Sequence, residues 1–446
     1  MYKLNEHLCA VEILTTGYCP FNCSYCYIPK SNTMKSIHKK IIESLKSGEY
    51  ITYLSKTYGK DLKHLSFWGT EPTLTLKYLA RLLPIIKKEF PNLETIQFST
   101  SMMSSPVEIL KFVKELVNND FNIKFGVQIS IDGPSWITDK NRIKGSGRDI
   151  PRNFFDLVKQ LNNIDTKRVK VWFHWKSTHN IDNIKMFIKH PSRLHEYVGY
   201  FDSIGDKFSK INRNKNVTLS RSAPSTLAVP GKYTSEDGKI FTVYLKLLHK
   251  KYYHTAYYHR LKRMLDSLDE LQNVNQFTCS GGDSNLGMAY NNKYHICHRT
   301  FYLDNEEYIQ SILKTDIDNW DISLFEKGTI DFIRKYYIAS PEDMFRFLYV
   351  LRGYHDFWRL RICTILSLLN EMALAGQIDI EYYKDKQLAL LFSIFLSICV
   401  GCPMENLLNT GSIHMTLISV IRLFGNGAFK EILSEVVKDG NYSRAK

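Results

Sequence analysis

The chain has 446 residues, of which 44% are hydrophobic and 23% charged, and its formal net charge is +14. This composition is that of a globular protein and excludes the disordered and fibrous classes. A chain of this length is expected to form two domains, or a barrel with an appended module. Because the lysines are spread along the chain without a basic block, the charge indicates a solvated surface rather than a nucleic-acid-binding segment.

Residues 1–12 lack the basic start and long apolar run of a secretory signal. The most apolar stretch, Leu388–Val400, is shorter than the ~20 residues that span a bilayer, and it is interpreted as a buried helix. We therefore expect a cytoplasmic protein with no membrane partner. In that compartment the nine cysteines are expected to ligate metal rather than to form disulfides.

The first half of the chain alternates β-rich runs with amphipathic helical patterns. The expected strands are Ala10–Thr16, His64–Gly69, Thr95–Ser101, Phe125–Asp132, Val169–Lys176 and Val217–Ser220. The expected helices include Leu76–Phe90, Val107–Asn118, Asn153–Asn163 and Ile181–His190. Strand–helix alternation implies right-handed crossovers and a parallel sheet. We expect an α/β fold, a partial (β/α)6 TIM-like barrel, with function at the carboxyl ends of its strands.

A Gly/Pro-containing passage, Ser222–Gly238, predicts a boundary between domains 1–238 and 239–446. In the second domain, Cys279–Phe301 has the pattern of a hairpin, with strand-like runs Leu286–Tyr290 and Tyr294–Cys297 on either side of Asn291-Asn292. Residues from about 305 to 398 have an entirely helical pattern and are expected to form a helical insertion.

Three cysteines follow the first expected strand with the spacing Cys-x3-Cys-x2-Cys, at Cys19, Cys23 and Cys26. Three thiolates so spaced can hold three irons of one cubane cluster. The fourth iron then stays open to chelate the amino and carboxylate groups of a small molecule. A structural zinc would need a closed tetrahedron, which Cys9 and His64 could in principle complete.

With the aromatic Tyr25 just before its third cysteine, this motif resembles the signature of the radical S-adenosylmethionine (SAM) superfamily. The resemblance continues after the second expected strand, where Gly69, Thr70, Glu71 and Pro72 are similar to a Gly-Gly-Glu-Pro motif. It implies that the exposed backbone of this turn contacts the SAM amino group, since a glycine permits close approach. Thr70 departs from the pattern but keeps its carbonyl.

The third and fourth expected strands end in two further segments of this kind. Ser99 and Ser101 stand where relatives have Thr-Asn-Gly, so the resemblance implies that a hydroxyl contacts the SAM ribose. The run from Ser130 through Asp132, followed by Arg142, resembles peptide-modifying and sulfatase-maturing radical SAM enzymes with a cysteine-rich C-terminal (SPASM) extension. There the serine and the arginine contact the SAM carboxylate, a pairing that suits a guanidinium.

Five cysteines lie in the second half of the chain. Cys279, Cys297, Cys399 and Cys402 suffice for one further cluster, which resembles the shorter "twitch" form of that extension. A fully ligated [4Fe–4S] cluster is suited to electron transfer, and a zinc site is the alternative for the same cysteines. Cys363 lies in a helical apolar pattern and is interpreted as a packed small hydrophobe.

The fifth expected strand contains Trp172 and Trp175 with His174 between them. Because alternate residues of a strand face opposite sides, two side chains of this aromatic run are expected to line the barrel interior. His174, His295 and His298 have no second feature that distinguishes them from ordinary satisfied polar residues, so no catalytic acid or base is assigned.

The resemblance implies that a reduced cluster cleaves SAM to a 5′-deoxyadenosyl radical, which abstracts a substrate hydrogen. The first hypothesis is modification of a ribosomally made peptide or protein (a RiPP-type maturase), supported by the positive charge because leader peptides are often acidic. Dehydrogenation of a small alcohol or sugar is the alternative, and a non-catalytic iron–sulfur or zinc protein that binds nucleic acid is a second one. The expected electron donor is a flavodoxin or ferredoxin.

Overall fold

The structure is a computed structural model, in which residues 9–26, 28, 30–103, 106–179, 181–220, 225–227, 285–290, 292, 294–295, 298, 301 and 338–339 are described. Its strands are β1 (Ala10–Thr16), β2 (His64–Gly69), β3 (Thr95–Thr100), β4 (Lys124–Ser130), β5 (Lys170–His179), β6 (Val217–Ser220), β7 (Ser225–Leu227), β8 (Asn285–Met288), β9 (Tyr294–His295) and β10 (Ile338–Ala339). Its helices are α1 (Asn32–Ser47), α2 (Glu49–Thr57), α3 (Leu76–Glu89), α4 (Val107–Asn118), α5 (Ser135–Asn141), α6 (Ser146–Leu161), α7 (Ile181–Lys189) and α8 (Pro191–Ile211).

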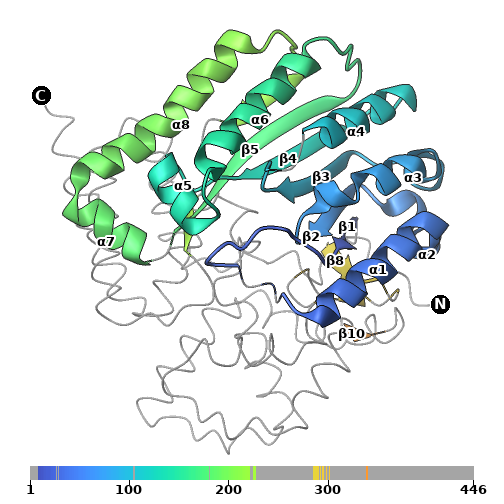
Figure 1. Ribbon diagram of the computed structural model, residues 1–446. Coiled ribbons are helices and arrows are strands. Elements are labelled where there is room, and N and C mark those ends of the chain that lie inside the picture. Colours follow the sequence, from blue (N-terminus) through green and yellow to red (C-terminus); the bar gives the residue numbers. More distant parts are fainter. Residues whose placement is uncertain are drawn as a thin grey trace, which may run out of the picture.

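The strands form a sheet in the order β10-β9-β8-β1-β2-β3-β4-β5-β6, with β7 paired to β5. Each strand from β1 to β5 pairs in parallel with the next one along the chain. Because right-handed crossovers that all step in one direction place their helices on one face, the helices cover the outside of the sheet (Figure 1). This is an α/β fold with a parallel sheet, consistent with the expected TIM-like partial barrel, and all six expected strands are confirmed.

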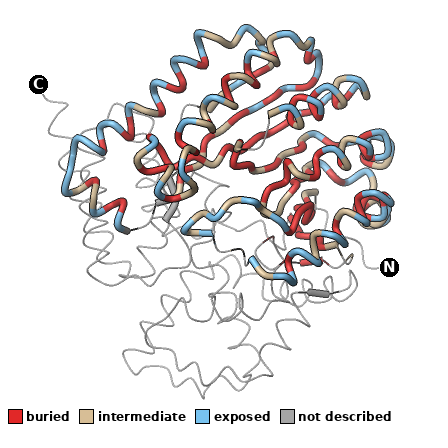
Figure 2. Tube along the Cα trace, viewed as in Figure 1, coloured by how far each residue is buried: buried red, intermediate tan, exposed pale blue. Residues whose placement is uncertain are grey.

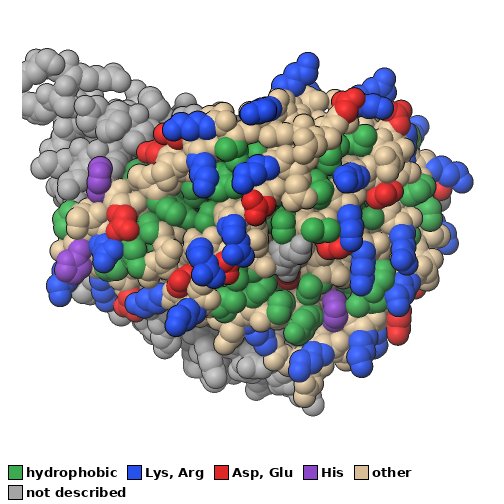
Figure 3. Space-filling model, turned by 45° about the horizontal axis from the view of Figure 1, so that its top comes forward, with side chains coloured by type: hydrophobic (Ala, Val, Ile, Leu, Met, Phe, Trp, Pro, Cys, Tyr) green, Lys and Arg blue, Asp and Glu red, His purple; other side chains and the backbone are tan. Residues whose placement is uncertain are grey.

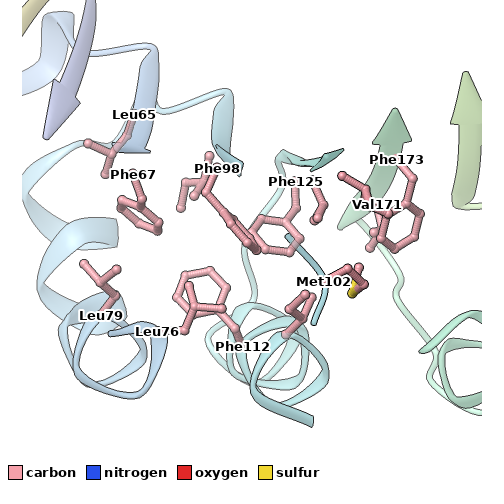
Figure 4. Packing of buried hydrophobic residues seen from close by; sticks show 14 of the residues in the cluster. Leu65, Phe67, Leu76, Leu79, Phe98, Met102, Phe112, Phe125, Val171 and Phe173 are labelled. Carbon is pink, nitrogen blue, oxygen red and sulfur yellow. The ribbon is translucent and has the colours of Figure 1, made fainter. Parts of the chain in front are cut away.

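The core lies between the outer face of the sheet and the helices. Leu65, Phe67, Phe98 and Phe125 point from the strands toward Leu76 and Leu79 of α3 and Phe112 of α4, and Val171 and Phe173 of β5 lie further along the same face of the sheet (Figure 4). Phe112 lies between two strand residues, with ring centroids 5.9 Å from Phe67 and 5.3 Å from Phe125. Figure 2 shows that the strands are buried along most of their length, whereas the helices are exposed on the face turned away from them.

Several helices begin or end at residues with a local physical cause. Ser31 caps α1 by accepting a hydrogen bond from the Met34 amide, and Gly48, at φ +76°, ends α1 and precedes α2. Gly147 lets α6 approach α5, since a Cβ there would lie 2.4 Å from Cα of Ser135. As a result α6 begins at Ser146, seven residues before the expected helix start, Asn153.

The hairpin expected around Asn291-Asn292 is confirmed, because β8 and β9 pair antiparallel. Asn292 has φ +57°, a conformation that asparagine tolerates, and its amide donates to the Ala289 carbonyl. β8 also pairs in parallel with β1, so the hairpin continues the barrel sheet. The expectation of an entirely helical segment from about 305 to 398 is wrong at β10, a short strand that pairs with β9.

The basic charge is dispersed over the surface. In Figure 3, lysine and arginine side chains are spread over the visible face with acidic side chains among them. In the part of the chain that the structure describes, no helix combines the length and the apolar character needed to cross a bilayer.

Candidate functional site

The loop that contains the three cysteines follows β1 at its carboxyl end and is held at its start and at its middle. At its start, the Tyr18 amide donates to Thr16 Oγ1 over 3.2 Å. Gly17 packs against α1, where a Cβ would lie 2.8 Å from the Met34 carbonyl oxygen. Further along, the Ser24 amide and hydroxyl both donate to the Asn141 carbonyl, at 2.8 and 3.1 Å. The end of α5 therefore holds the middle of the cysteine loop.

The three thiols influence one another electrostatically. Burial raises the pKa of Cys19 to about 12, and negative charge on Glu71, Cys23 and Cys26 adds to the effect. Burial also raises the pKa of Cys23, whereas the Arg142 guanidinium lowers it. Three cysteines on one loop supply the ligands of a cubane cluster, in which each thiolate binds a different iron. Among the described residues, no three Cys, His, Asp or Glu side chains are grouped so that they could hold a single metal ion.

Cys9 and His64 cannot complete a zinc site with these thiols. The His64 amide donates to the Cys9 carbonyl at the amino ends of β1 and β2. Cys19 lies beyond the carboxyl end of β1, a strand of seven residues that rises about 3.3 Å per residue, so the two ends are roughly 20 Å apart. The strand itself separates these residues from the cysteine loop.

The Gly69–Pro72 turn lies directly against the start of the cysteine loop. Gly69 has φ +132°, and a Cβ there would lie 2.3 Å from the Thr16 carbonyl oxygen. The Thr70 amide donates to that oxygen over 3.3 Å. Pro72 begins a single 3-10 turn over Pro72–Leu74. The glycine that was expected to permit close approach of SAM is therefore also required by the contact between β1 and β2.

Glu71 joins this turn to the carboxyl end of β3. Its side chain is buried, and Oε1 accepts from the hydroxyls of Thr73 and Thr100 at 2.6 and 2.7 Å. Oε2 accepts from the amide and the hydroxyl of Ser101 at 2.9 and 2.6 Å. The Ser101 hydroxyl proton is thus engaged by Glu71. Ser99 Oγ accepts from Gln128 over 2.8 Å, which leaves its own proton available to a further acceptor.

Asp132 and Arg142 form a buried ion pair beside the cysteine loop. Arg142 Nε and Nη2 donate to Asp132 over 3.1 and 3.4 Å, and Tyr25 Oη and the Thr178 amide donate to the same carboxylate. Burial raises the pKa of Asp132, and the guanidinium opposes that shift. Burial disfavours the charge on Arg142, yet the carboxylate raises its pKa. Because Arg142 keeps its proton and two of its N–H groups bind the carboxylate, we treat the pair as ionised.

The inner face of the sheet carries a row of polar side chains. Gln97 donates to Ser66 Oγ over 2.9 Å, across β3 and β2. Two residues further along the strands, toward the cysteine loop, Gln128 donates to Ser99. Gln128 Oε1 lies 3.1 Å from His174 Nε2. These residues alternate along their strands with the apolar side chains of the core. The barrel interior therefore offers hydroxyls, amides and an imidazole.

The aromatic run of β5 divides between the two faces of the sheet, as expected. Phe173 and Trp175 are buried, and both rings pack edge-on against Phe154 of α6. Trp172 is 41% exposed and stacks on His174, with ring centroids 4.5 Å apart. Gly126 of β4 lies opposite Trp172 in the register, and a Cβ there would lie 3.5 Å from Trp172 Cε3, which is an ordinary contact distance.

A buried Glu12–His298 pair escaped the sequence analysis. Glu12 Oε2 accepts from the backbone amide of His298 over 3.2 Å and lies 2.8 Å from Nδ1 of its ring. The His298 ring contacts Trp68, with centroids 3.8 Å apart. The available signal was a single acidic residue within the apolar run of β1. His298 is therefore bound through its Nδ1 side, as expected for a satisfied polar residue, but among the described residues its Nε2 has no hydrogen-bond partner.

Residues 13–173 match the model of the Radical SAM superfamily. This segment includes the cysteine loop, the Gly69–Pro72 turn and the Asp132–Arg142 pair. It is a radical SAM domain, which indicates an enzyme and implies a [4Fe–4S] cluster and the use of SAM. No curated protein matches the chain significantly.

Among solved structures, native anSMEcpe with bound AdoMet is similar with a TM-score of 0.47 at 16% identity, over 96% of this chain and 99% of that one. anSMEcpe with AdoMet and the Cp18Cys peptide gives a TM-score of 0.44 at 17% identity, over 97% and 99%. Streptococcus suis SuiB bound to its precursor peptide SuiA gives 0.33 at 14% identity, over 68% of this chain and 61% of SuiB. Likeness at this level is too distant to assign a substrate.

The cysteines expected to hold a second cluster are Cys279, Cys297, Cys399 and Cys402. All four lie outside the described residues, as do Cys363 and Leu388–Val400. The second cluster therefore stays a prediction.

Proposed function

We propose that this protein is a radical SAM enzyme in which Cys19, Cys23 and Cys26 hold the SAM-binding [4Fe–4S] cluster. The observation that carries the proposal is their shared loop, which is fixed against both the Gly69–Pro72 turn and the Asp132–Arg142 pair. When bound, the cluster and SAM supply a 5′-deoxyadenosyl radical that abstracts a hydrogen atom from the substrate.

The residues around the loop have the groups needed to bind SAM. The backbone of Gly69, Thr70, Glu71 and Pro72 would face the methionine amino group. Since Ser101 donates to Glu71, the ribose contact falls to Ser99, whose proton is available.

The SAM carboxylate would bind to Ser130 and to the N–H groups of Arg142 that Asp132 does not engage. A guanidinium has five N–H donors, of which Asp132 takes two, so three remain.

For the substrate, we propose a peptide segment of a ribosomally made peptide or protein. On the inner face of β3 and β4, Gln97, Ser99 and Gln128 supply side-chain groups of the kind that hydrogen-bond to peptide amides. Lys176 of β5, opposite Ser130 in the register, gives this face positive charge, which would favour an acidic segment. A small alcohol or sugar, as in dehydrogenation, is the alternative substrate for the same polar groups.

The proposal extends to the second half of the chain. Residues 239–446 would form a SPASM/twitch-like domain with a second [4Fe–4S] cluster on Cys279, Cys297, Cys399 and Cys402. The support is that these four cysteines, apart from the three of the N-terminal loop, suffice to ligate one further cluster. A zinc ion bound by the same four is the alternative. Reducing equivalents would come from a flavodoxin or ferredoxin in the cytoplasm.

Anaerobic reconstitution followed by iron analysis tests the first cluster. The wild type should bind about eight irons per chain, and replacement of Cys19, Cys23 and Cys26 by Ala should remove about half of them. 5′-Deoxyadenosine, measured by chromatography after addition of SAM and dithionite, should disappear with them. Cys9→Ala is the matched control and should keep both. Wild-type iron content in the triple variant would exclude the ligand assignment.

Mass spectrometry of a candidate peptide encoded beside the gene tests the substrate class. A mass change that requires SAM, dithionite and the three cysteines supports peptide modification. If the peptide is unmodified while a small alcohol or sugar is oxidised under the same conditions, the dehydrogenase alternative holds instead.

A further inference from the structure

The Asp132–Arg142 pair is buried, and several donors bind its carboxylate. The Asp132 side chain is fully buried, and that of Arg142 is 7% exposed. The carboxylate accepts from both Arg142 and Tyr25, and from the amide of Thr178 at 2.9 Å. Its lone pairs are therefore occupied, and the plane of the guanidinium is fixed by two donors on one edge.

The remaining terminal nitrogen of Arg142 faces the cysteine loop. Nη1 lies 3.9 Å from Cys23 Sγ, within hydrogen-bonding range of sulfur. The guanidinium carbon also lies 5.5 Å from the centre of the Tyr25 ring, whose hydroxyl donates to Asp132. Between these two residues, Ser24 is bonded to Asn141. Residues 23 to 25 are thus held, one after another, by groups of the segment from Asp132 to Arg142.

We propose that Arg142 is a positioning residue for the cluster itself: oriented by Asp132, it directs an N–H and a positive charge at the sulfur of Cys23. Hydrogen bonds to cluster sulfurs and the net charge around them set reduction potentials, and partners behind the ligands hold the ligands in place. A donor at Cys23 stabilises the reduced, more negative cluster and therefore raises its reduction potential. The Tyr25–Asp132 hydrogen bond secures the same loop against opening.

This inference rests on the proposed function, because it needs a cluster on Cys19, Cys23 and Cys26. It goes beyond the SAM-carboxylate role, since it predicts an effect of Arg142 before any SAM is bound. A role confined to SAM binding would leave the SAM-free cluster unchanged. A role confined to folding would alter stability without shifting the potential of the clusters that form.

The test is a redox titration of the reconstituted full-length protein without SAM, followed by paramagnetic resonance of the reduced cluster. The main variant is Asp132→Asn with Arg142→Met, in which neither buried charge is left alone. Its midpoint potential at the Cys19 site should be lower than that of the wild type. Arg148→Met, at an exposed arginine of α6 that pairs with Asp149, is the matched control and should not change it.

Tyr25→Phe tests the loop with the smallest change. It removes the hydroxyl that donates to Asp132 and keeps the ring beneath Arg142. Loss of one hydrogen bond to a charged group, worth about 1.5–3 kcal/mol, should speed iron release to a chelator by roughly tenfold or more. Iron release at the wild-type rate would contradict the role of Tyr25 in holding the loop.

The outcomes separate this inference from the proposed function. A wild type without any cluster at Cys19, Cys23 and Cys26 would refute the proposed function. If the double variant binds its cluster and has the wild-type reduction potential, the positioning role of Arg142 is overturned, but the proposed function is not. If the double variant takes up no cluster, Arg142→Lys decides, since a lysine keeps the positive charge but its single nitrogen cannot take the places of both Nη2 at Asp132 and Nη1 at Cys23. The potential should then fall by less than in the double variant, and a wild-type potential in Arg142→Lys would overturn the hydrogen bond from residue 142 to Cys23.

Discussion

The Glu71 carboxylate accepts hydrogen bonds from three residues, of which Ser101 contributes both its amide and its hydroxyl. Glu71→Gln would turn one acceptor into an NH2 group facing other donors. Because hydrogen bonds to charged groups are worth about 1.5–3 kcal/mol each, we expect the free energy of unfolding to fall by about 2–3 kcal/mol in urea denaturation. Glu94→Gln, at an exposed pair with Lys63, should change it by less than about 1 kcal/mol. Equal effects of the two substitutions would contradict the role of Glu71.

Gly69 shows how far sequence reasoning about one residue extends. The motif predicts a glycine that permits close approach, but the group that approaches it in the structure is the Thr16 carbonyl oxygen, at 2.3 Å from a Cβ. That partner lies on another strand, so its position follows from the register between β1 and β2 and not from the motif.

Gly69→Ala should therefore displace the turn from the start of the cysteine loop. We expect weaker SAM binding and lower stability, measured by isothermal titration of the reconstituted protein and by melting. Gly199→Ala is the control, since no atom of the described residues lies within 4 Å of a Cβ at that position in α8. Alanine in a helix should leave stability unchanged or raise it by up to ~1 kcal/mol. Wild-type SAM affinity in Gly69→Ala would show that the turn is not constrained as described.

At the scale of elements, the strands were predictable because successive residues of a strand face opposite sides of the sheet, and the residue types of these segments alternate with that period of two. The short helix α5, which the sequence analysis does not predict, depends on a contact between distant residues. α5 has only seven residues and is preceded by Gly133 at φ +127°, where a Cβ would lie 2.7 Å from the Tyr197 ring. Its existence is thus tied to α8, which no local pattern in residues 135–141 reveals.

The Glu12–His298 contact joins residues that are 286 positions apart and fixes the chain after the β8–β9 hairpin beside β1. Glu12→Ala would leave the amide and Nδ1 of His298 buried without an acceptor, at a cost of about 1–3 kcal/mol. We expect the β8 amides, Leu286 and Met288 among them, to exchange faster in hydrogen-exchange mass spectrometry. Strands β3 and β4 should keep their protection, and Glu12→Gln, which retains one acceptor, should show a smaller effect. Uniformly faster exchange would indicate a global loss of stability instead.

On the scale of the whole molecule, the curled sheet has two chemically different faces. The outer face is aromatic and aliphatic and is covered by helices (Figure 4), whereas the inner face carries the polar row from Ser66 to His174. Sequence alternation predicts that two residues of the aromatic run face inward. It does not predict that Gly126, on the neighbouring strand, is the residue that lies opposite Trp172. That juxtaposition depends on how β4 and β5 are paired.

Trp172 is the large aromatic side chain that this inner face exposes most among the described residues, at 41%. If the substrate lies there, Trp172→Ala should raise its KM by roughly two- to tenfold, since an aromatic contact is worth about 0.5–1.5 kcal/mol. Trp172→Phe should retain most of the affinity. Cleavage of SAM in the absence of substrate should be unchanged in both variants. The indole lies opposite Gly126, four residues before Ser130 along β4, and is therefore distant from the cysteine loop. Product formation and 5′-deoxyadenosine are therefore measured together. A fall in both would mean that Trp172 supports the SAM site, and an unchanged KM would place the substrate elsewhere.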